Sequence, residues 1–451
     1  MDLVAGRGRR PRGACVTAEL KFASTRGEAP LVELSEAIVQ GLAPDGGLYV
    51  PTHLPGIDRD AIDAAQPLSR IACGALAGFF AGDRLLPMLG KISQAALDFP
   101  APTTAVAQCR ERLSVLELYH GPTAAFKDFG ARFLAETLER LQRGSEPPLT
   151  ILVATSGDTG GAVAAAFHRR PWVRIVILYP KGLVSARQEQ QLTCWGDNVM
   201  SLRIDGTFDD CQRLVKEAFM DRALGRKHRF SSANSINIGR LLPQMVYYVA
   251  SSIEIENRTG AKACYIIPAG NLGNAFAAVW ARALGFPIDR IILAHNANRT
   301  VPDYLASGEW RPRASIPTLA SAMDVGNPSN MERIRALYPT ISLLREQLSA
   351  DSVDDAAIRH RIAEDFAQYG REWCPHTATA AEVYRRLSER ERRDHPWVLV
   401  ATAHPAKFND IVEPIIGKPV AVPPALERLL RLPQHYLDLP PRLSAVAAAL
   451  Q

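Results

Sequence analysis

The sequence of 451 residues lacks an apolar run long enough to cross a membrane. Its longest stretch without charged or amide side chains covers residues 71–82, whereas a membrane-spanning helix needs about 20 apolar residues. A longer charge-free stretch, residues 263–281, is interrupted by proline, glycine and asparagine. We therefore expect no membrane segment.

Paired cysteines are also lacking. The seven cysteines are far apart, odd in number and never spaced as C-x-x-C. This spacing argues against disulfides and against structural zinc. We therefore expect free thiols, a cytoplasmic location and no metal site.

The body of the chain has no block of charge of one sign, and its net charge is only +5. A nucleic-acid partner is therefore not expected. The first 18 residues contain four arginines but no apolar core, so they are not a secretory signal. An organelle transit peptide would be richer in serine, so we expect residues 1–19 to be a disordered extension, with a start codon placed too far upstream as the alternative.

From residue 114 onward, β-type and α-type segments alternate. Strands are expected at residues 114–119, 149–154, 173–179, 199–204, 263–268, 288–294 and 397–401, and helices at 161–168, 185–195, 208–221 and 274–284. Such alternation is typical of an α/β fold with mainly parallel sheets, in which ligands bind beyond the carboxyl ends of the strands. Residues 20–110 are expected to be mostly helical, with tight turns in GLAPDGGLYVP at 41–51.

Lys127 lies at an expected strand-to-helix turn. Residues 118–130 read LYHGPTAAFKDFG, and apolar residues at helical spacing follow. A lysine that loses hydration has a lowered pKa, and its neutral amine can attack a carbonyl group. The alternative is a solvated lysine without a chemical role, which is the commoner case at a helix start.

Two glycine-rich loops each follow an expected strand and open an expected helix. Residues 155–161 read TSGDTGG, and residues 268–274 read PAGNLGN. Glycine lets a ligand approach the backbone, and the N–H groups at a helix start favour a carboxylate or a phosphate. The alternative for both loops is a capped helix start without a ligand.

Two further segments carry polar groups between apolar ones. Residues 232–240 read SANSINIGR, in which Arg240 with amide and hydroxyl donors suits a phosphate or carboxylate, and helix capping by Asn234 or Ser235 is the alternative. Residues 398–408 read VLVATAHPAKF, and the Thr402 hydroxyl at the strand end can hydrogen-bond a pyridine nitrogen. A catalytic role for His404 and Lys407 is left open, but a histidine at a strand end is more often a structural group, and neither residue is included among the predicted site residues.

The order of these motifs resembles that of threonine synthases, pyridoxal-phosphate enzymes of the tryptophan synthase β-family, also called fold type II. The resemblance extends from about Lys21 to near the C-terminus and includes the 41–51 turns and CPHTA at 374–378. It implies a threonine-synthase-specific N-terminal domain at 20–110 and two α/β domains. The first, 111–230, would carry the Schiff-base lysine and the substrate-carboxylate loop, and the larger one, 231–451, the cofactor phosphate loop.

The resemblance also implies a role for each motif. Lys127 would be the catalytic residue and would bind pyridoxal 5'-phosphate covalently. The other cofactor-binding residues would be Asp158, Gly270, Asn271, Leu272, Gly273, Asn274 and Thr402. The substrate carboxylate would be bound by Thr155, Ser156 and Thr159, and the substrate phosphate by Asn234, Ser235 and Arg240.

The implied activity is the conversion of O-phospho-L-homoserine and water into L-threonine and phosphate, carried out by a monomer or homodimer. Three alternatives remain open: a lyase acting on O-phosphothreonine or a similar phosphorylated amino acid, a serine or threonine dehydratase, and a catalytically silent binding protein. The 232–240 cluster and the 41–51 turns argue against the dehydratase. The presence of Lys127 and the 268–274 loop argues against the silent protein.

Overall fold

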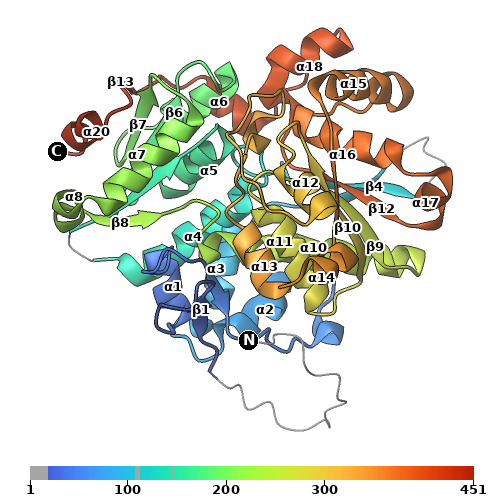
Figure 1. Cartoon of the computed structure of the whole chain (residues 1–451), viewed down its shortest axis with the longest axis horizontal. Helices are drawn as coiled ribbons and strands as arrows, with labels where there is room; N and C mark the ends of the chain where they lie inside the picture. The colour runs from blue at the N-terminus through green and yellow to red at the C-terminus, as the bar shows by residue number, and fades with distance from the viewer. Residues whose placement is uncertain (1–18, 107–111, 145–146) are drawn as a thin grey trace.

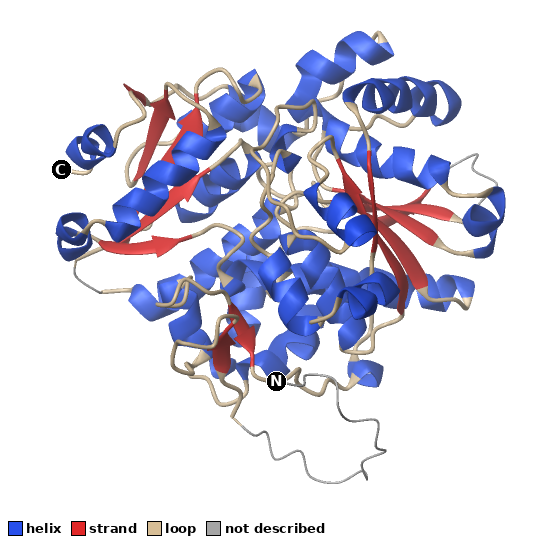
Figure 2. Cartoon of the chain, in the orientation of Figure 1, coloured by secondary structure: helices blue, strands red, loops and turns tan. Residues whose placement is uncertain are grey.

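The computed structural model describes residues 19–106, 112–144 and 147–451. The extension expected over residues 1–19 lies outside these ranges except for its last residue. Two sheets lie on opposite sides of the molecule, with helices around them and loops between them, and N-terminal helices lie beside both (Figures 1 and 2). Among the described residues, no helix combines the length and apolarity needed to span a bilayer.

The first sheet has the strand order β13-β7-β6-β5-β8, and all its neighbours are parallel. Its strands are β5 (Leu149–Ala154), β6 (Val173–Pro180), β7 (Val199–Ile204), β8 (Arg229–Ser232) and β13 (Leu437–Leu439). Ile151 and Ile175 pack into the same core as helix α5 (Asp158–Phe167), whereas Leu152 and Val176 pack with helix α7 (Phe208–Met220). Both faces of the sheet are therefore covered, which explains why the central strands are apolar at nearly every position.

The second sheet has the order β11-β10-β9-β12-β4-β3, and only the edge pair β3–β4 is antiparallel. Its strands are β3 (Thr103–Ala105), β4 (Leu113–Glu117), β9 (Ala263–Pro268), β10 (Ile288–His295), β11 (Ser349–Ser352) and β12 (Trp397–Ala401). Successive residues of β12 again enter two different cores, with Val398 on one side and Leu399 on the other. The carboxyl ends of β9 and β12 lie beside each other because these strands pair in parallel.

The N-terminal region combines a two-stranded sheet with helices. Strands β1 (Phe22–Ser24) and β2 (Tyr49–Pro51) are antiparallel, and the main helices are α1 (Leu34–Gln40), α2 (Leu68–Leu76) and α3 (Leu89–Ala96). The expected tight turns lie at the end of α1 and before β2. Gly41 and Gly46 there have φ values of 72° and 76°, which non-glycine residues rarely adopt.

The remaining helices cover the two large sheets or connect their strands. They are α4 (Lys127–Gln142), α6 (Ala186–Thr193), α8 (Arg222–Lys227), α9 (Ile238–Leu241), α10 (Gln244–Thr259), α11 (Gly273–Ala283), α12 (Thr300–Ser307), α13 (Met331–Leu337), α14 (Ile341–Gln347), α15 (Asp355–Tyr369), α16 (Pro375–Arg386), α17 (Glu389–Asp394), α18 (Asn409–Ile416), α19 (Pro424–Leu430) and α20 (Leu443–Ala449). Among several short 3₁₀ turns, η5 (Pro405–Phe408) matters for the site described below.

The residue ranges predicted for the two α/β domains differ from the residues that form the two large sheets. Strand β4 was expected to belong with residues 111–230, but it pairs with β12 of the second sheet. Strand β13, near the C-terminus, returns to the first sheet and pairs with β7. Alternation of segments identifies strands but not their neighbours, so we propose that residues 103–117 belong to the second α/β unit and residues 437–450 to the first.

Candidate active site

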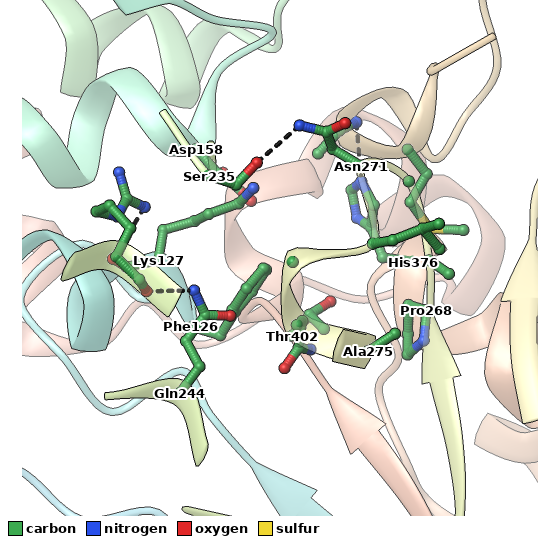
Figure 3. A pocket seen from close by; sticks show the side chains of 18 residues that line it. Phe126, Lys127, Asp158, Ser235, Gln244, Pro268, Asn271, Ala275, His376 and Thr402 are labelled. Carbon is green, nitrogen blue, oxygen red and sulfur yellow. Dashed lines mark hydrogen bonds between the residues drawn. The ribbon is translucent and has the colours of Figure 1, made fainter. Parts of the chain in front are cut away.

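One cavity collects ten of the fourteen predicted site residues (Figure 3). They are Lys127, Asp158, Ser235, Arg240, Gly270, Asn271, Leu272, Gly273, Asn274 and Thr402. The other four, Thr155, Ser156, Thr159 and Asn234, do not line this cavity. Its lining is completed by residues that were not predicted, namely Phe126, Gln244, Pro268, Ala269, Ala275, Ala322, Met323 and His376.

Lys127 is held at the cavity by backbone contacts between its turn and the end of β12. The N–H of Phe126 donates to the carbonyl of Thr402 at 2.9 Å, and the N–H of His404 donates to the carbonyl of Ala124 at 3.0 Å. Ala124 has a φ of 55°, an unusual conformation for a residue with a side chain. The turn that carries Lys127 is therefore fixed directly to the strand end that carries Thr402.

The Asp128 carboxylate also fixes the conformation of this turn. The buried carboxylate of Asp128 accepts hydrogen bonds from the N–H of Thr123 at 2.8 Å and from its hydroxyl at 2.7 Å. A Cβ atom at Gly121 would lie 2.5 Å from Oδ2 of Asp128, so glycine is required for this contact. The turn before α4 therefore depends on both Gly121 and Asp128.

The surroundings of Lys127 favour its neutral amine. Burial, together with the positive charges of Arg240 and Lys407, lowers the pKa of Lys127 to about 8, although the Asp158 carboxylate acts in the opposite direction. In Figure 3 the Lys127 side chain extends toward Asp158 and Ser235. A lysine with this pKa can serve both as a nucleophile and as a base near neutral pH.

Asp158 is the first residue of α5, and its carboxylate is paired inside the protein. Oδ1 of Asp158 lies 2.8 Å from Nζ of Lys407 and accepts a hydrogen bond from Nε2 of Gln188 at 3.0 Å. Burial opposes ionisation, but the charge of Lys407 and the hydrogen bonds from Lys407 and Gln188 outweigh it and lower the pKa of Asp158 to about 2. The carboxylate is therefore charged at every physiological pH.

The Thr155 hydroxyl is occupied within its own loop. Oγ1 of Thr155 accepts hydrogen bonds from the N–H of Gly157 at 3.0 Å and of Gly160 at 2.9 Å. Thr155 therefore accepts hydrogen bonds from amides at the start of α5, as expected in the alternative interpretation of this loop as a capped helix start. Its predicted contact with a substrate carboxylate stays a prediction.

The 268–274 loop contains one residue in the left-handed backbone conformation and leads directly into a helix, whose start favours an anion. Leu272 has a φ of 63° and immediately precedes α11, whose first N–H groups have no acceptor within the helix. Oδ1 of Asn274 accepts hydrogen bonds from the hydroxyls of Tyr247 and Tyr248, at 2.5 Å and 2.9 Å. Among the described residues, its buried Nδ2 has no partner.

Arg240 lies in α9 with only 1% of its surface exposed. It donates through NH1 to the carbonyl of Ala233 at 2.5 Å, and burial lowers its pKa to about 10. Within the described part of the chain, its buried Nε has no hydrogen-bond partner. The helix is capped by Asn237, whose side chain accepts from the N–H of Gly239, so the expected alternative of capping by Asn234 or Ser235 is wrong.

Two titratable side chains at or near the cavity, those of His376 and Lys407, are not among the residues predicted from the sequence. His376, at the start of α16, accepts the N–H of Ala322 through Nε2 at 3.1 Å. Its buried Nδ1 has no partner among the described residues, and burial lowers its pKa to about 4. The CPHTA motif indicated a helix start but gave no sign that its histidine would reach the cavity. Lys407 is not among the predicted site residues, because no local pattern relates it to Asp158.

The buried nitrogen atoms that have no hydrogen-bond partner show whether the cavity fits pyridoxal phosphate. Apart from Arg240, which is assigned to the substrate, the described structure leaves two buried nitrogens of the cavity lining without partners, on Asn274 and His376. A phosphate needs several donors of this kind, and an amine of lowered pKa suits the aldehyde. The donors fit the cofactor, and we propose that Lys127 would form the covalent link, residues 270–274 would bind the phosphate and Thr402 would hydrogen-bond the pyridine nitrogen.

The fold and the cavity define a pyridoxal-phosphate-dependent enzyme of fold type II. Residues 100–403 match the family described as "Pyridoxal-phosphate dependent enzyme". Residues 21–87 match "Threonine synthase N terminus", and residues 377–450 match "Threonine synthase, C-terminal". The chain belongs to the threonine synthase family, and pyridoxal phosphate is its cofactor.

Individual relatives agree with this assignment. A threonine synthase of Serratia marcescens is 41% identical over 411 residues, which cover 91% of this chain and 94% of the relative. That of Escherichia coli is 39% identical over 417 residues, covering 92% and 95%. The crystal structure of threonine synthase from Escherichia coli matches with a TM-score of 0.88 at 36% identity, covering 95% and 99% of the two chains. A pyridoxal-phosphate-bound threonine synthase from Brucella melitensis matches with a TM-score of 0.85 at 33% identity, covering 96% and 98%.

Proposed function

We propose that the chain converts O-phospho-L-homoserine and water into L-threonine and phosphate at the Lys127 cavity. The observation that carries this proposal is the position of Lys127 beside the buried guanidinium of Arg240, whose Nε has no partner in the described structure. A buried cation without a carboxylate at hydrogen-bond distance suits a substrate that carries its own anion.

Pyridoxal phosphate, when bound, supplies an electron sink that stabilises negative charge at the carbon next to the substrate nitrogen. The protein would hold this group through Lys127 and the amides of residues 270–274. The Thr402 hydroxyl faces the same cavity and can hydrogen-bond a ring nitrogen without adding charge. A neutral partner leaves the ring nitrogen less firmly protonated than an aspartate would.

Lys127 moves the protons. Its pKa of about 8 leaves an appreciable fraction of the amine neutral near neutral pH, and the amine takes a proton from Cα of the substrate and exchanges protons at Cβ. The phosphate leaves from Cγ as one proton is lost from Cβ, and that proton is returned to Cγ, which becomes the methyl group. Water then adds its hydroxyl at Cβ and gives its proton to the released phosphate, and Lys127 returns the first proton to Cα. Ser235 and Arg240 stabilise the leaving phosphate, since charge accumulates on it as the bond breaks.

The substrate carboxylate is assigned to the loop that starts α5. Ser156 and Thr159 are only partly buried, and neither lines the cavity in the described structure. Gly157, with a φ of 124°, gives this loop a conformation that a side chain would strain. Their contact with the carboxylate is a proposal that substrate affinity in Thr159→Val tests directly.

The decisive experiment incubates purified protein with O-phospho-L-homoserine and measures phosphate, threonine and 2-oxobutanoate together. Threonine and phosphate in equal amounts, lost in Lys127→Ala but retained in Lys181→Ala, would support the proposal. Lys181 is an exposed lysine and serves as the matched control. Phosphate accompanied by 2-oxobutanoate would contradict it and favour a lyase acting on phosphorylated amino acids.

The assembly and the location remain part of the proposal. A monomer or homodimer is expected, and light scattering after size-exclusion chromatography measures its mass. The five cysteines in the described ranges are free thiols, as a reducing compartment requires. A cytoplasmic enzyme without a nucleic-acid partner is the arrangement that we propose.

A further inference from the structure

Lys407 is a lysine with no exposed surface, which is rare for this residue. It lies in the 3₁₀ turn η5, five residues after Thr402. Its Nζ lies 2.8 Å from Oδ1 of Asp158 and donates to the carbonyl of Thr123 at 2.8 Å. An ammonium group buried in this way is retained only if its partners compensate for the lost hydration.

The two acceptors of Lys407 come from parts of the fold that are distant in sequence. Asp158 begins α5 beside the first sheet, Thr123 lies in the turn that leads to Lys127, and Lys407 follows β12 of the second sheet. One ammonium group therefore joins both α/β units to the turn of the reactive lysine.

The backbone around Lys407 is also held by helix α6 and its N-cap residue Ser185. The hydroxyl of Ser185 donates to the carbonyl of Lys407 at 2.8 Å, and NH1 of Arg187 donates to the carbonyl of Ala406 at 2.5 Å. From the same helix, Gln188 donates to the Oδ1 of Asp158 that pairs with Lys407. Helix α6 therefore sets the relative positions of the ammonium and the carboxylate.

We propose that Lys407 is a positioning residue of the cofactor site: its ammonium group is the fixed counter-charge that keeps the Asp158 carboxylate ionised and directed at the cavity beside Lys127. Asp158 lines that cavity, whereas Lys407 does not. Lys407 therefore acts on the cofactor through Asp158. This inference rests on the site of the proposed function but not on its substrate.

Among the charged and titratable groups around Lys407 and Asp158, the Lys407 ammonium is the main group that compensates the negative charge of the Asp158 carboxylate. Asp158 also interacts with His376, Lys127 and Cys374, and His376 has a pKa lowered to about 4 by burial and stays neutral. Lys407 also interacts with the buried carboxyl of Asp128 and with His404, whose pKa burial lowers to about 4. Asp128 accepts its hydrogen bonds from Thr123.

The test is a double-mutant cycle with Lys407→Met and Asp158→Asn, read by cofactor affinity and by thermal unfolding of the cofactor-free protein. Lys407→Met should weaken pyridoxal phosphate binding by about tenfold or more, as expected for losing a hydrogen bond to a charged group. In the Asp158→Asn background, the same change should alter affinity less than about twofold. Each single variant should unfold at a lower temperature than the double variant, because each leaves one buried charge unpaired.

Lys418→Met is the matched control. Lys418 also forms an ion pair, 2.9 Å from Glu372, but its side chain is 50% exposed, so cofactor affinity should not change. The proposal is wrong if Lys407→Met binds the cofactor as tightly as the unmodified protein. It is also wrong if the loss of cofactor affinity in the double variant equals the product of the losses in the two single variants.

Folding failure is also informative. A Lys407→Met protein that does not fold, beside a folded double variant, would support the pairing. Loss of fold in both would assign Lys407 to the folding core and overturn the proposal. None of these readouts uses O-phospho-L-homoserine, so failure here is distinguishable from failure of the proposed reaction.

Discussion

Nδ2 of Asn271 donates a hydrogen bond to Oγ of Ser235 at 2.7 Å. Asn271 lies in the loop assigned to the cofactor phosphate, and Ser235 in the segment assigned to the substrate phosphate. Asn330 strengthens the connection, since its Nδ2 donates to the carbonyl of Asn271 at 2.9 Å. The two anion sites are therefore parts of one hydrogen-bonded structure, in which displacement of one loop displaces the other.

Replacement of Arg333 by lysine should disturb both loops without touching the cavity. The buried guanidinium donates to the carbonyls of Tyr49, Ser235 and Ile236, at 3.1, 3.3 and 2.6 Å. A lysine cannot reach all three acceptors, so we expect KM for the phosphorylated substrate to rise about tenfold and the free energy of unfolding to fall by about 2 kcal/mol. Steady-state kinetics and urea unfolding measure these effects.

The control for this prediction is Arg335→Lys, on the exposed side of the same helix. It should leave both quantities within experimental error. Equal effects of the two substitutions would refute the link between Arg333 and the anion loops.

Gly130→Ala should displace Arg240. A Cβ atom at position 130 would lie 2.6 Å from the carbonyl oxygen of Arg240 and 2.9 Å from its Nε, so the α9 segment must move. We expect a loss of about 1–3 kcal/mol in unfolding free energy, as for overpacked cores. Competitive inhibition by inorganic phosphate should weaken about tenfold or more, as expected for losing a hydrogen bond to a charged donor. Gly225→Ala, in α8 with open space around it, should instead be neutral or stabilising.

The lowered pKa of Lys127 predicts how the cofactor-free protein reacts with pyridoxal phosphate at different pH values. Only a neutral amine attacks the aldehyde, so labelling of Lys127 should rise with pH and level off above a midpoint near 8. Borohydride trapping followed by peptide mass spectrometry measures the labelling. Comparison with exposed Lys181 in the same sample removes the titration of the cofactor itself. A midpoint near the ordinary 10.5 of lysine would contradict the environment described here.

Buried histidines should make the fold sensitive to acid. Burial lowers the pKa of His295 from 6.5 to about 3, so between these pH values the unfolded state binds more protons than the folded state. The free energy of unfolding should therefore decrease as the pH falls from 6.5, by up to about 1.4 kcal/mol per pH unit for this residue. His295→Gln should flatten the slope between pH 6.5 and 4 in urea unfolding. His360→Gln, at a histidine whose side chain is 64% exposed, is the control variant in the same measurement.

Local pattern alone located the strands and helices that were predicted from residue 114 onward, four strands with the bounds of the structure and the other elements within three residues. The strands expected at residues 149–154, 199–204, 263–268 and 397–401 have the same bounds in the structure. Apolar runs bounded by glycine, proline and polar residues specify strands through interactions within a few residues. The position of Lys127 on a strand-to-helix turn follows from the same local signals.

The tertiary structure decided which of these pieces meet. The pairing of β4 with β12 and of β13 with β7 joins segments that are distant in the chain. The hydrophobic periodicity of a segment indicates a strand but not which strand it pairs with. The same holds for Lys407 and Asp158. A lysine in a sequence has no fixed environment, because its hydration and its counter-charge depend on which surfaces the packed sheets bring around it.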